Sequence, residues 1–506
     1  MSPTREIGAD TDMNLRTLLD AHAPVSVTGV LDRPIDTVVS DSRQVARGSL
    51  FVAIRGGQEL DRHAFVEDAV ERGAEAVVVE EAAIDTGAAT RVVVDDSRRA
   101  LAALAARLHG HPSRAMQCVG VTGTNGKSTT ASIIRHLLAA SGSPAAYLGT
   151  LGFHWGDQVE PLPNTTPEAG ALQALLARAR DAGCRSLAME VSSHGLALGR
   201  VQGIGFDAAV FTNLTRDHLD FHGSEEEYFA AKSLLFRDLA GSSAAVLNAD
   251  DPRAGKLAEL TPAQVWTFGE SGADVRLRNI RFDADRTHLS MDTPQGEFEV
   301  ETALTGRYNS SNVVAAVTTG FALGIEGEAI RRGVADVAQI PGRFERIDEG
   351  QPFQVLVDYA HTPAGLETVL RAARELTSRR LLCVFGCGGD RDTGKRPMMG
   401  QVAEALADAI YLTADNPRSE SPRQIIDQIA AGMRASDAVV EEPDRRTAIH
   451  AALGNAEVGD VVVLAGKGDE PYQILDGGRI LPFDDRDVAR EALRDRGVAG
   501  EALENC

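Results

Sequence analysis

The sequence predicts an α/β protein of three domains, and three observations lead to this prediction. The 506 residues exceed the length that one hydrophobic core usually serves. Short apolar runs alternate with helical patterns, which is typical of parallel sheets covered by helices. Polar clusters follow these runs, where ligands of such sheets collect. We place a small α/β domain in residues 1–114, a central parallel-sheet domain in 115–340 and a Rossmann-like α/β domain in 341–506.

The N-terminal segment mixes predicted strands and helices. We expect strands at residues 37–43, 49–54 and 76–79 and helices at residues 63–72 and 97–109. Ser97 is the expected cap of the last helix, and residues 110–113 are the expected linker to the next domain. The polar group Asp41-Ser42-Arg43 follows a strand, so it is either a plain turn or a ligand contact. The residues alone favour the turn.

The stretch from Gly120 to Thr129 predicts a phosphate-binding turn. It reads Gly-Val-Thr-Gly-Thr-Asn-Gly-Lys-Ser-Thr and lies between an apolar run and a helical pattern. A glycine-rich turn between a strand and a helix directs backbone N–H groups and the positive end of the helix dipole at one point. Lys127 adds a mobile cation, and the Ser128 hydroxyl can reach Mg²⁺. Val121 departs from the general P-loop spacing, but the stretch still predicts a nucleoside-triphosphate site.

Further polar groups follow the other strands predicted in the central segment. These strands are residues 118–121, 186–190, 208–212 and 244–248. After the phosphate-binding turn, the polar groups are residues 190–194, 213–218 and 248–251. Because the carboxyl ends of parallel strands meet at one edge of a sheet, we expect these stretches to form one site.

Three side chains in this segment need separate interpretation. Glu190 ends an apolar strand, where a carboxylate is costly without a cation, which favours Mg²⁺ ligation over a chance edge charge. His218 more often has a structural role at such a position, because Mg²⁺ prefers oxygen ligands. Lys232 lies in an amphipathic helical pattern, for which a solvated lysine is the default interpretation.

The last segment repeats the alternation of strands and helices. Strands are predicted at residues 355–358, 381–385, 409–413 and 460–465. The polar clusters that follow them are residues 358–361, 386–391, 415–418 and 466–470. Two ligand-binding sheet edges that face across a cleft suit a reaction that joins two molecules.

Composition and charge exclude several classes of partner. The balance of 51 basic and 73 acidic residues gives a net charge of −22, which disfavours nucleic acid and anionic membrane surfaces. No apolar run is long enough to span a bilayer and no signal-peptide pattern is present, so we expect a cytoplasmic protein. The five cysteines fit reduced thiols, and Cys383 and Cys387 are expected to be buried thiols rather than metal ligands.

A set of motifs along the chain resembles the Mur ligases, the ATP-dependent amide-bond-forming enzymes of peptidoglycan synthesis. The family's phosphate-binding turn reads Gly-x-x-Gly-Thr-Asn-Gly-Lys-Ser/Thr, which accounts for Val121. The other matching motifs are Asn164-Thr-Thr-Pro, Met189-Glu-Val-Ser-Ser-His, Asn213-Leu-Thr-Arg-Asp-His-Leu-Asp, Ala230-Ala-Lys, Gly306-Arg-Tyr-Asn, Pro341-Gly-Arg-Phe-Glu and Asp358-Tyr-Ala-His-Thr-Pro. Together these motifs are highly specific and extend over the length of the chain.

The resemblance implies a central P-loop ATPase domain with ATP as co-substrate and Mg²⁺ as cofactor. The implied ATP-binding residues are Gly123, Thr124, Asn125, Gly126, Lys127, Ser128, Thr129, Asn309, Arg343 and Asp358. The implied catalytic residues are Lys127, Glu190, His218 and Lys232, and the implied metal-binding residues are Ser128, Glu190, His218 and Lys232. Lys232 matches the family's carbamylated lysine, in which CO₂ converts a cation into an anion that can bind a second Mg²⁺.

The same resemblance implies a UDP-sugar site in and beside the N-terminal domain and an amino-acid site in the C-terminal domain. The UDP-sugar residues are Ser42, Asn164, Thr165, Thr166, Ser192 and Arg200, so Ser42 becomes an expected ligand contact. The amino-acid residues are Arg391, Asp415, Asn416, Pro417, Arg418, Gly466 and Glu470.

The Asp415-Asn-Pro-Arg418 motif is similar to the branch of the family that adds meso-diaminopimelate to UDP-MurNAc-L-Ala-D-Glu. Diaminopimelate carries a carboxylate that lysine lacks, and an arginine can bind this group bidentately. Leaving that arginine buried and unpaired with lysine would cost about 2–5 kcal/mol. The expected reaction proceeds through an acyl phosphate of the D-glutamate γ-carboxylate, and we expect a monomer.

One position departs from the family pattern, and several alternatives stay open. The family commonly has Gly-Lys-Gly-His-Glu near the end of the chain, whereas Asp469 stands here in place of the histidine. Because Glu470 keeps its place, substrate binding is expected to survive. The alternatives are a sibling ligase that adds L-lysine, a folylpolyglutamate-type ligase and a nucleotide-binding protein without catalytic activity.

Overall fold

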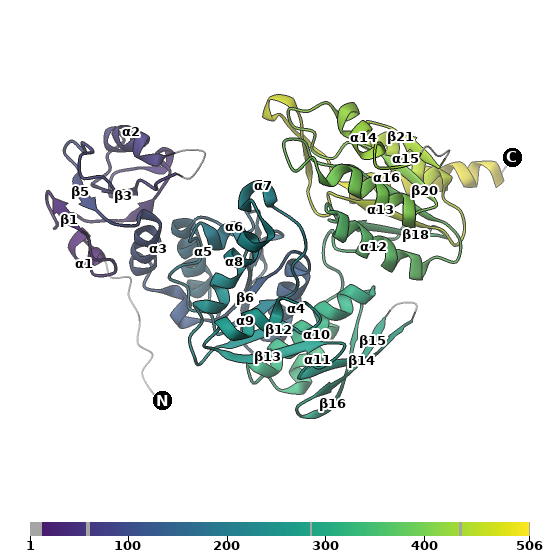
Figure 1. Cartoon of the computed structure of the whole chain (residues 1–506), viewed down its shortest axis with the longest axis horizontal. Helices are drawn as coiled ribbons and strands as arrows, with labels where there is room; N and C mark the ends of the chain where they lie inside the picture. Colours follow the sequence, from purple (N-terminus) through teal and green to yellow (C-terminus); the bar gives the residue numbers. More distant parts are fainter. Residues whose placement is uncertain (1–12, 57–60, 284–285, 435–437, 505–506) are drawn as a thin grey trace.

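The structure is a computed structural model that describes residues 13–56, 61–283, 286–434 and 438–504. Three domains with separate main sheets follow one another along the chain, as predicted (Figure 1). The central domain lies between the other two and contacts both. Among the described residues, no helix is long and apolar enough to cross a membrane.

The N-terminal domain has one sheet between two helical layers. Its strand order is β1-β5-β4-β3-β2, in which only β1 is antiparallel to its neighbour. The strands are β1 (Ser26–Thr28), β2 (Thr37–Val39), β3 (Ser49–Val52), β4 (Ala76–Val79) and β5 (Thr90–Val93). The helices are α1 (Leu15–Leu19), α2 (Val66–Glu71) and α3 (Ser97–Leu108). Alternate residues of β3 and β4 face two apolar clusters, one on each side of the sheet.

Two local expectations for this domain are wrong in detail. The strand expected at residues 37–43 ends at Val39, and Ser42–Gln44 form a 3-10 turn. Asp96 rather than Ser97 caps α3, because its carboxylate accepts hydrogen bonds from the backbone of the next turn, while the Ser97 hydroxyl donates to Glu80 at 2.7 Å. The expected linker at residues 110–113 lies between α3 and the next domain, and a 3-10 turn begins within it at Pro112.

The central domain contains an eleven-stranded sheet with the order β16-β15-β14-β13-β12-β11-β6-β10-β7-β8-β9. The strands from β14 to β7 in this order are parallel, and the strands outside them are antiparallel. The predicted strands correspond to β6 (Gln117–Thr122), β10 (Ser186–Glu190), β11 (Ala208–Phe211) and β12 (Ala244–Asn248). The other strands are β7 (Ala145–Gly149), β8 (Gly152–Trp155), β9 (Gln158–Glu160), β13 (Gln264–Gly269), β14 (Val275–Phe282), β15 (Thr287–Thr293) and β16 (Gly296–Thr302).

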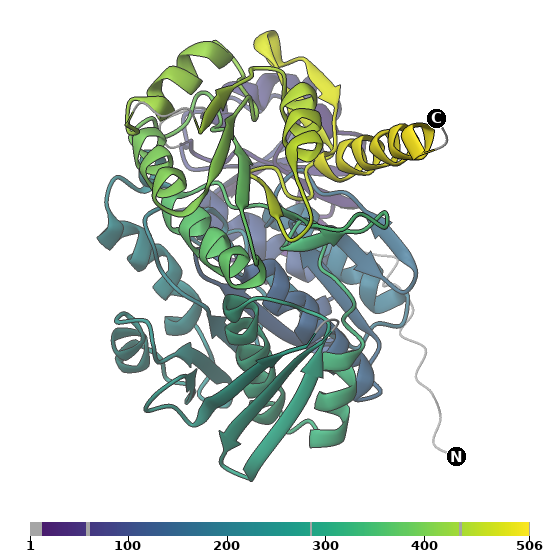
Figure 2. The same cartoon turned by 90° about the vertical axis from the view of Figure 1, so that its right-hand side faces the viewer.

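Helices cover both faces of this sheet. The helices are α4 (Lys127–Ala140), α5 (Ala169–Asp181), α6 (Ser193–Ala197), α7 (Leu219–His222), α8 (Glu225–Arg237), α9 (Ala254–Leu260), α10 (Arg307–Ala322) and α11 (Gly327–Ala335). Helices α4, α10 and α11 share one apolar cluster, and α5, α8 and α9 share the other. Helices α10 and α11 also pack against one face of β14–β16. Figure 2 shows the long strands β14–β16 at the end of the domain away from the C-terminal domain.

The C-terminal domain has a six-stranded sheet with the order β17-β18-β22-β19-β20-β21. Its strands are β17 (Glu345–Ile347), β18 (Gln354–Asp358), β19 (Leu381–Phe385), β20 (Ala409–Leu412), β21 (Val439–Glu441) and β22 (Val461–Ala465), and only β17 is antiparallel. The helices are α12 (Pro363–Leu376), α13 (Lys395–Leu406), α14 (Pro422–Ala430), α15 (Arg445–Asn455) and α16 (Asp485–Glu504). A hairpin of β23 (Tyr472–Ile474) and β24 (Ile480–Pro482) follows β22.

The cysteines of the described residues are thiols. Cys118, Cys184, Cys383 and Cys387 are buried and unpaired, and Cys506 lies outside the described residues. Burial raises the pKa of Cys383 and Cys387 to about 12, so both are inert at neutral pH. The expectation of buried thiols in the C-terminal sheet is confirmed.

Candidate active site

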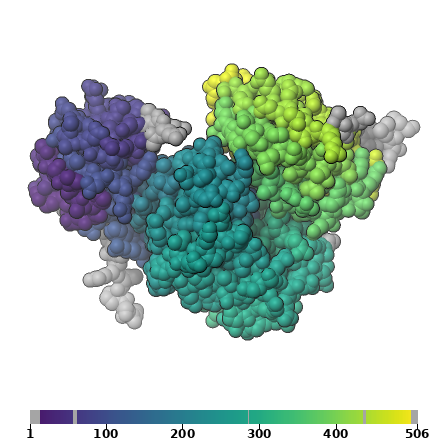
Figure 3. Space-filling view, in the orientation of Figure 1, coloured from purple at the N-terminus to yellow at the C-terminus, as the bar shows by residue number. Residues whose placement is uncertain are grey.

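A cavity with a volume of about 460 Å³ lies between the central and C-terminal domains. Figure 3 shows the C-terminal domain standing over the central domain on this side of the molecule. The lining includes thirteen of the predicted site residues: Thr124, Asn125, Gly126, Lys127, Ser128, Thr129, Thr165, Glu190, Ser192, His218, Lys232, Arg343 and Asp358. The sheet edge therefore gathers the phosphate-binding turn and the stretches after β10 and β11 into one site, as expected from the positions of the strand ends. The stretch at residues 248–251, which was expected to join them, does not line the cavity, and Asn248 and Asp251 instead hydrogen-bond the backbone of Thr212 and Leu214.

The phosphate-binding turn joins β6 to α4, and α4 begins at Lys127. Gly123 has a φ of 151°, and a Cβ there would lie 1.9 Å from the Thr212 hydroxyl, so only glycine fits. The Lys127 ammonium donates to the carbonyls of Gly123 and Thr124 at 3.0 and 2.8 Å. The turn thus places backbone N–H groups and the partly buried ammonium of Lys127 at the start of a helix, where a phosphate binds.

Lys232 is buried beside this turn, so its interpretation as a solvated lysine is wrong. Its ammonium donates to the Gly123 carbonyl at 2.8 Å and lies 4.5 Å from the ring centre of Tyr228. Burial lowers the pKa of Lys232 well below its usual range, and the charge of Lys127 lowers it further. The amphipathic pattern of α8 did not reveal this, because the face that carries Lys232 packs against another part of the central domain.

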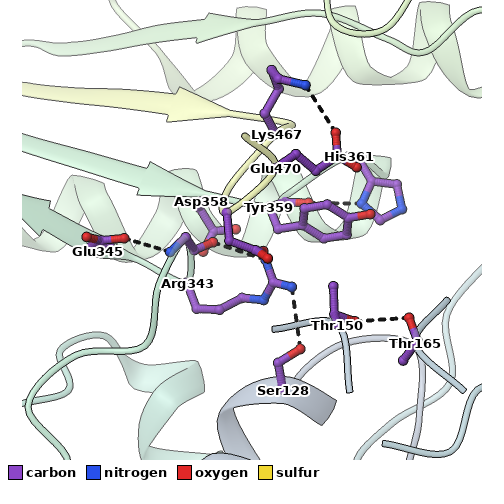
Figure 4. Close-up of polar contacts among 12 residues, drawn as sticks. Ser128, Thr150, Thr165, Arg343, Glu345, Asp358, Tyr359, His361, Lys467 and Glu470 are labelled. Atoms are coloured by element: carbon purple, nitrogen blue, oxygen red, sulfur yellow. Dashed lines mark hydrogen bonds and ion pairs between the residues drawn. The ribbon is translucent and has the colours of Figure 1, made fainter. Parts of the chain in front are cut away.

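Glu190 ends β10 and points into the cavity from a buried position. One carboxylate oxygen accepts hydrogen bonds from the Tyr147 hydroxyl at 2.5 Å and from the Thr150 backbone at 2.9 Å. The Thr150 hydroxyl also contacts Thr165 at 3.0 Å (Figure 4). These donors orient the carboxylate toward the phosphate-binding turn.

His218 stands at the edge of the same cavity in a left-handed conformation, with a φ of 53°. Its ring lies 3.4 Å from the Asp217 carboxylate and 4.8 Å from the ring centre of His194. Burial lowers the pKa of His218 to about 3, with Asp217 opposing the shift. The imidazole is therefore neutral near pH 7 and retains a lone pair.

Arg343 reaches across the domain boundary to the phosphate-binding turn. Figure 4 shows its guanidinium extending toward Ser128, whose hydroxyl lies 3.4 Å away. The guanidinium also lies 3.0 Å from the Asp469 carboxylate and 4.4 Å from the ring centre of Tyr359. Asp358 accepts a hydrogen bond from the Phe344 backbone at 2.7 Å, which fixes the segment that carries Arg343.

The expected UDP-sugar residues of the central domain form a connected group beside Glu190. The Thr166 hydroxyl donates to the Glu190 carbonyl and accepts from the Ser192 backbone, both at 3.0 Å. Arg200 donates to the Thr166 carbonyl at 3.0 Å. Asn164 is exposed. Ser42 lies in the N-terminal domain, where its hydroxyl hydrogen-bonds Asp68, so the described contacts do not join it to this group.

The expected amino-acid residues form a second group at the carboxyl ends of β19, β20 and β22. The Asn416 amide donates to Glu470 at 2.8 Å, and the Lys467 ammonium lies 3.1 Å from the same carboxylate (Figure 4). Arg418 donates to the Gly389 carbonyl at 2.7 Å. Gly466 has a φ of 115° and a close contact with Asp415, and Pro417 and Arg391 lie on the neighbouring loops.

The structure adds residues that the motifs did not single out. Asn312 lines the cavity, accepts from the Thr130 hydroxyl at 3.3 Å and donates to Asn309 at 3.1 Å, so Asn309 lies one layer behind it. Asn309 and Asn312 are three positions apart, a spacing that places both on one face of a helix. This spacing could have indicated that Asn312 belongs to the site. Tyr147 lies in an apolar stretch, and no pattern in the sequence marks it as a site residue. Lys467 lies in the predicted polar cluster of residues 466–470, although it was not among the expected amino-acid residues.

Comparison with known proteins places this site in a family. Three family profiles match the chain: "Mur ligase family, catalytic domain" at residues 34–109, "Mur ligase middle domain" at 121–320 and "Mur ligase, glutamate ligase domain" at 342–468. The chain belongs to the Mur ligase family. Members of this family are ATP-dependent amide-bond-forming ligases, so the chain is an enzyme of this class.

Several bacterial Mur ligases are similar to this chain. A UDP-N-acetylmuramoyl-L-alanyl-D-glutamate–2,6-diaminopimelate ligase of Geobacillus kaustophilus is 47% identical over 90% of this chain and 94% of its own length. The protein of the same name from Thermosynechococcus vestitus is 45% identical over 96% and 98%. A solved structure of a ligase with that name is 33% identical and superposes with a TM-score of 0.68 over 96% of this chain and all of the other.

More distant Mur ligases share the fold. The MurF ligase of Thermotoga maritima in complex with ADP is 21% identical and has a TM-score of 0.66 over 92% of this chain and all of the other. At this identity the likeness supports the three-domain α/β fold alone.

Proposed function

We propose that this chain adds meso-diaminopimelate to the D-glutamate γ-carboxylate of UDP-MurNAc-L-Ala-D-Glu, with ATP as the energy source. The identity of 41–47% with ligases of that name, over at least 90% of this chain, carries the proposal. The site agrees with it, because one cavity combines the phosphate-binding turn with Thr165 and Ser192 of the expected UDP-sugar group.

The first step transfers the γ-phosphoryl group of ATP to the γ-carboxylate, which yields an acyl phosphate and ADP. Lys127, Arg343 and the backbone of residues 123–129 would bind the phosphates, and Asn309 and Asp358 would support the rest of the nucleotide. Buried cations stabilise the charge that develops on the transferring group, which is the main source of catalysis in phosphoryl transfer. In the second step the amine attacks the acyl carbon, loses a proton and displaces phosphate.

The donor set around the turn fits Mg²⁺. No group of three or more histidine, cysteine, aspartate or glutamate side chains within the described ranges is suited to hold a metal ion by itself. Mg²⁺ usually takes only one or two protein carboxylates and completes its shell with water and phosphate oxygens. Buried Glu190 and the Ser128 hydroxyl supply such a partial set in the cavity. When bound there, the ion would neutralise phosphate charge, with His218 beside it.

Carbamylation of Lys232 belongs to the proposal as well. Two ammonium groups, those of Lys127 and Lys232, lie against the single carbonyl of Gly123, and their mutual repulsion disfavours two charges there. A neutral amine reacts with CO₂, and the resulting carbamate would place oxygen ligands beside Lys127 for a second Mg²⁺.

The two other substrates are assigned to the two remaining groups of residues. Asn164, Thr165, Thr166, Ser192 and Arg200, with Ser42 of the N-terminal domain, would bind the UDP-muramoyl dipeptide. Arg391, Asp415, Asn416, Pro417, Arg418, Gly466 and Glu470 would bind diaminopimelate. Arg418 would pair with the carboxylate that lysine lacks, so it carries the choice between the two amino acids.

The proposal includes action as a monomer. The net charge of −22 argues against nucleic acid and anionic membranes as partners. ATP and a UDP-linked precursor as substrates fit a cytoplasmic enzyme.

The test is phosphate release and amide formation in the presence of all three substrates, with meso-diaminopimelate compared with L-lysine. We expect product with diaminopimelate and a preference over lysine of at least about 10³-fold. Arg418→Lys should lower that preference, because an ammonium cannot form the bidentate pair. Product with lysine alone would favour the sibling lysine-adding ligase, and the absence of product with either amino acid would reject the proposal.

A further inference from the structure

Arg396 is a fully buried arginine that no step of the proposed reaction uses. It lies in the first turn of α13, and its side chain is 0% exposed. Its two terminal nitrogens form a bidentate pair with the Glu420 carboxylate at 2.7 and 2.8 Å. One nitrogen also donates to the Gln428 side chain at 2.6 Å, and the other to the Gly388 carbonyl at 3.1 Å. A buried guanidinium needs an opposite charge and hydrogen-bond acceptors to offset the loss of its hydration.

These partners belong to two different loops of the proposed amino-acid site. Gly388 lies in the loop after β19, which carries Arg391, and Glu420 lies just beyond Arg418 in the segment after β20. Glu420 also accepts a hydrogen bond from the Asp390 backbone at 2.6 Å. The pair of Arg396 and Glu420 therefore connects the two loops through hydrogen bonds to Gly388 and Asp390.

The two loops are in close contact along their length. The Gly389 backbone donates to the Asn416 carbonyl at 2.9 Å, and the Ser419 hydroxyl donates to Asp390 at 2.6 Å. A Cβ at Gly389 would lie 1.9 Å from the Pro417 carbonyl oxygen, so the backbones touch.

Both loops hold non-glycine residues in a strained conformation. Asp390 and Arg418 have φ angles of 54° and 52°, which non-glycine residues adopt only when their surroundings require it. The direction of the Arg418 side chain thus depends on contacts that its own backbone preference does not supply.

We propose that Arg396 and Glu420 are positioning residues that fix the separation between Arg391 and Arg418 and thereby set the amino-acid selectivity of the enzyme. The inference rests on the proposed function. A diamino diacid presents a second charged end at a fixed distance from the reacting amine. The arginine that pairs with that end discriminates against lysine only when it is held in place, since a mobile guanidinium turns to solvent at little cost.

Arg396 is too deeply buried to act on the substrate directly, and the Glu420 carboxylate that it binds is 25% exposed. The Arg396 side chain is enclosed by α13, α14 and the two loops, where it hydrogen-bonds Glu420, Gln428 and the Gly388 carbonyl. Its effect must therefore pass through the loops, and it should change amino-acid binding without changing the sites for ATP and the UDP-linked substrate.

The experiment compares wild type with Arg396→Lys and Glu420→Gln. Lysine can pair with one carboxylate oxygen but cannot also reach Gly388 and Gln428. Glutamine keeps the shape of Glu420 and an acceptor but removes the charge, so it tests the pair if the first variant does not fold. The matched control is Arg423→Lys on α14, an exposed arginine that pairs with Asp427 and Glu441 and touches neither loop.

The readout is kcat and KM for each of the three substrates and the ratio of kcat/KM for diaminopimelate and lysine. We expect the KM for diaminopimelate to rise roughly 10- to 100-fold and the selectivity ratio to fall, with the KM for ATP and for the UDP-linked substrate within about twofold of wild type. The control should match wild type.

The outcomes separate the inference from the proposed function. Folded variants that keep wild-type selectivity, or that lose affinity for all three substrates in parallel, would overturn the positioning role. A wild-type protein that forms no amide with diaminopimelate would overturn the proposed function and the inference with it.

Discussion

The guanidinium of Arg343 lies 3.0 Å from the carboxylate of Asp469, and both side chains are only 13% exposed. Arg343 comes from the segment that enters the C-terminal domain, and Asp469 comes from the loop after β22. Although burial alone would lower the pKa of Arg343, Asp469 and neighbouring carboxylates raise it. Asp469, which stands where a histidine was expected from the family pattern, thus fixes the position of Arg343, whose guanidinium extends to Ser128.

Replacement of Asp469 by asparagine should weaken ATP binding. The change leaves the buried Arg343 without its nearest counter-charge, so the guanidinium loses its fixed direction. We expect the KM for ATP to rise roughly tenfold, with the KM of the other two substrates unchanged, in steady-state assays. Asp348→Asn is the control, because Asp348 pairs with Arg346 on the surface. An unchanged KM for ATP would show that Arg343 needs no partner at position 469.

Replacement of Lys232 by alanine should lower activity by at least about 10²-fold and remove any dependence on bicarbonate. The wild type should lose activity in CO₂-depleted buffer, and ¹³C-bicarbonate should give a carbamate NMR signal that the variant lacks. Lys256→Ala on α9 is the control, since Lys256 is exposed. A fully active Lys232→Ala enzyme would exclude the carbamate.

Replacement of Tyr147 by phenylalanine should raise the Mg²⁺ concentration needed for half-maximal activity. The Tyr147 hydroxyl donates to Glu190 at 2.5 Å, and loss of a group that orients a metal ligand typically costs 10- to 100-fold in metal affinity. A Mg²⁺ titration of activity measures the effect. Tyr411→Phe is the control, because Tyr411 is equally buried but its hydroxyl contacts Asn455, far from the cavity. Equal Mg²⁺ dependence in both variants would contradict the role of Tyr147.

Replacement of Asp358 by asparagine should stabilise the ligand-free protein at pH 8 more than at pH 5. Burial raises the pKa of Asp358 from 3.8 to about 6, so the folded state binds a proton more tightly than the unfolded state. The native protein therefore loses stability as pH rises from about 4 to about 6, by roughly 2–3 kcal/mol, and does not regain it above pH 6.

Asparagine removes this pH-dependent loss and keeps an acceptor for the Phe344 backbone. The difference between the thermal unfolding midpoints of the variant and wild type, measured across this pH range, gives the effect. A difference that is constant with pH would mean that Asp358 titrates with an ordinary pKa.

Much of the fold was predictable because its signals are local. The phosphate-binding turn, the buried strands β6, β10, β19 and β22, and the polar clusters after them were all found in short stretches of sequence. The strands β14–β16 were missed, because their exposed faces carry polar and charged residues that resemble surface loops in composition.

The roles of single side chains were predictable to a smaller extent. Lys127 and Ser128 lie within the pattern that indicates their chemistry. Lys232 lies more than a hundred positions away from the turn it contacts, and its own helix gave the opposite interpretation. Ser97 was the expected cap, but Glu80, which is adjacent only in the folded domain, draws its hydroxyl away.

The sequence by itself determined the class of sheet, the phosphate-binding turn and the family, because these depend on residue order and short-range periodicity. Tertiary structure alone decided which groups meet: Lys232 with Lys127, Arg343 with Asp469, and Arg396 with Glu420. Charge interactions depend on distance and burial, and both arise only when segments far apart in the chain exclude water between them.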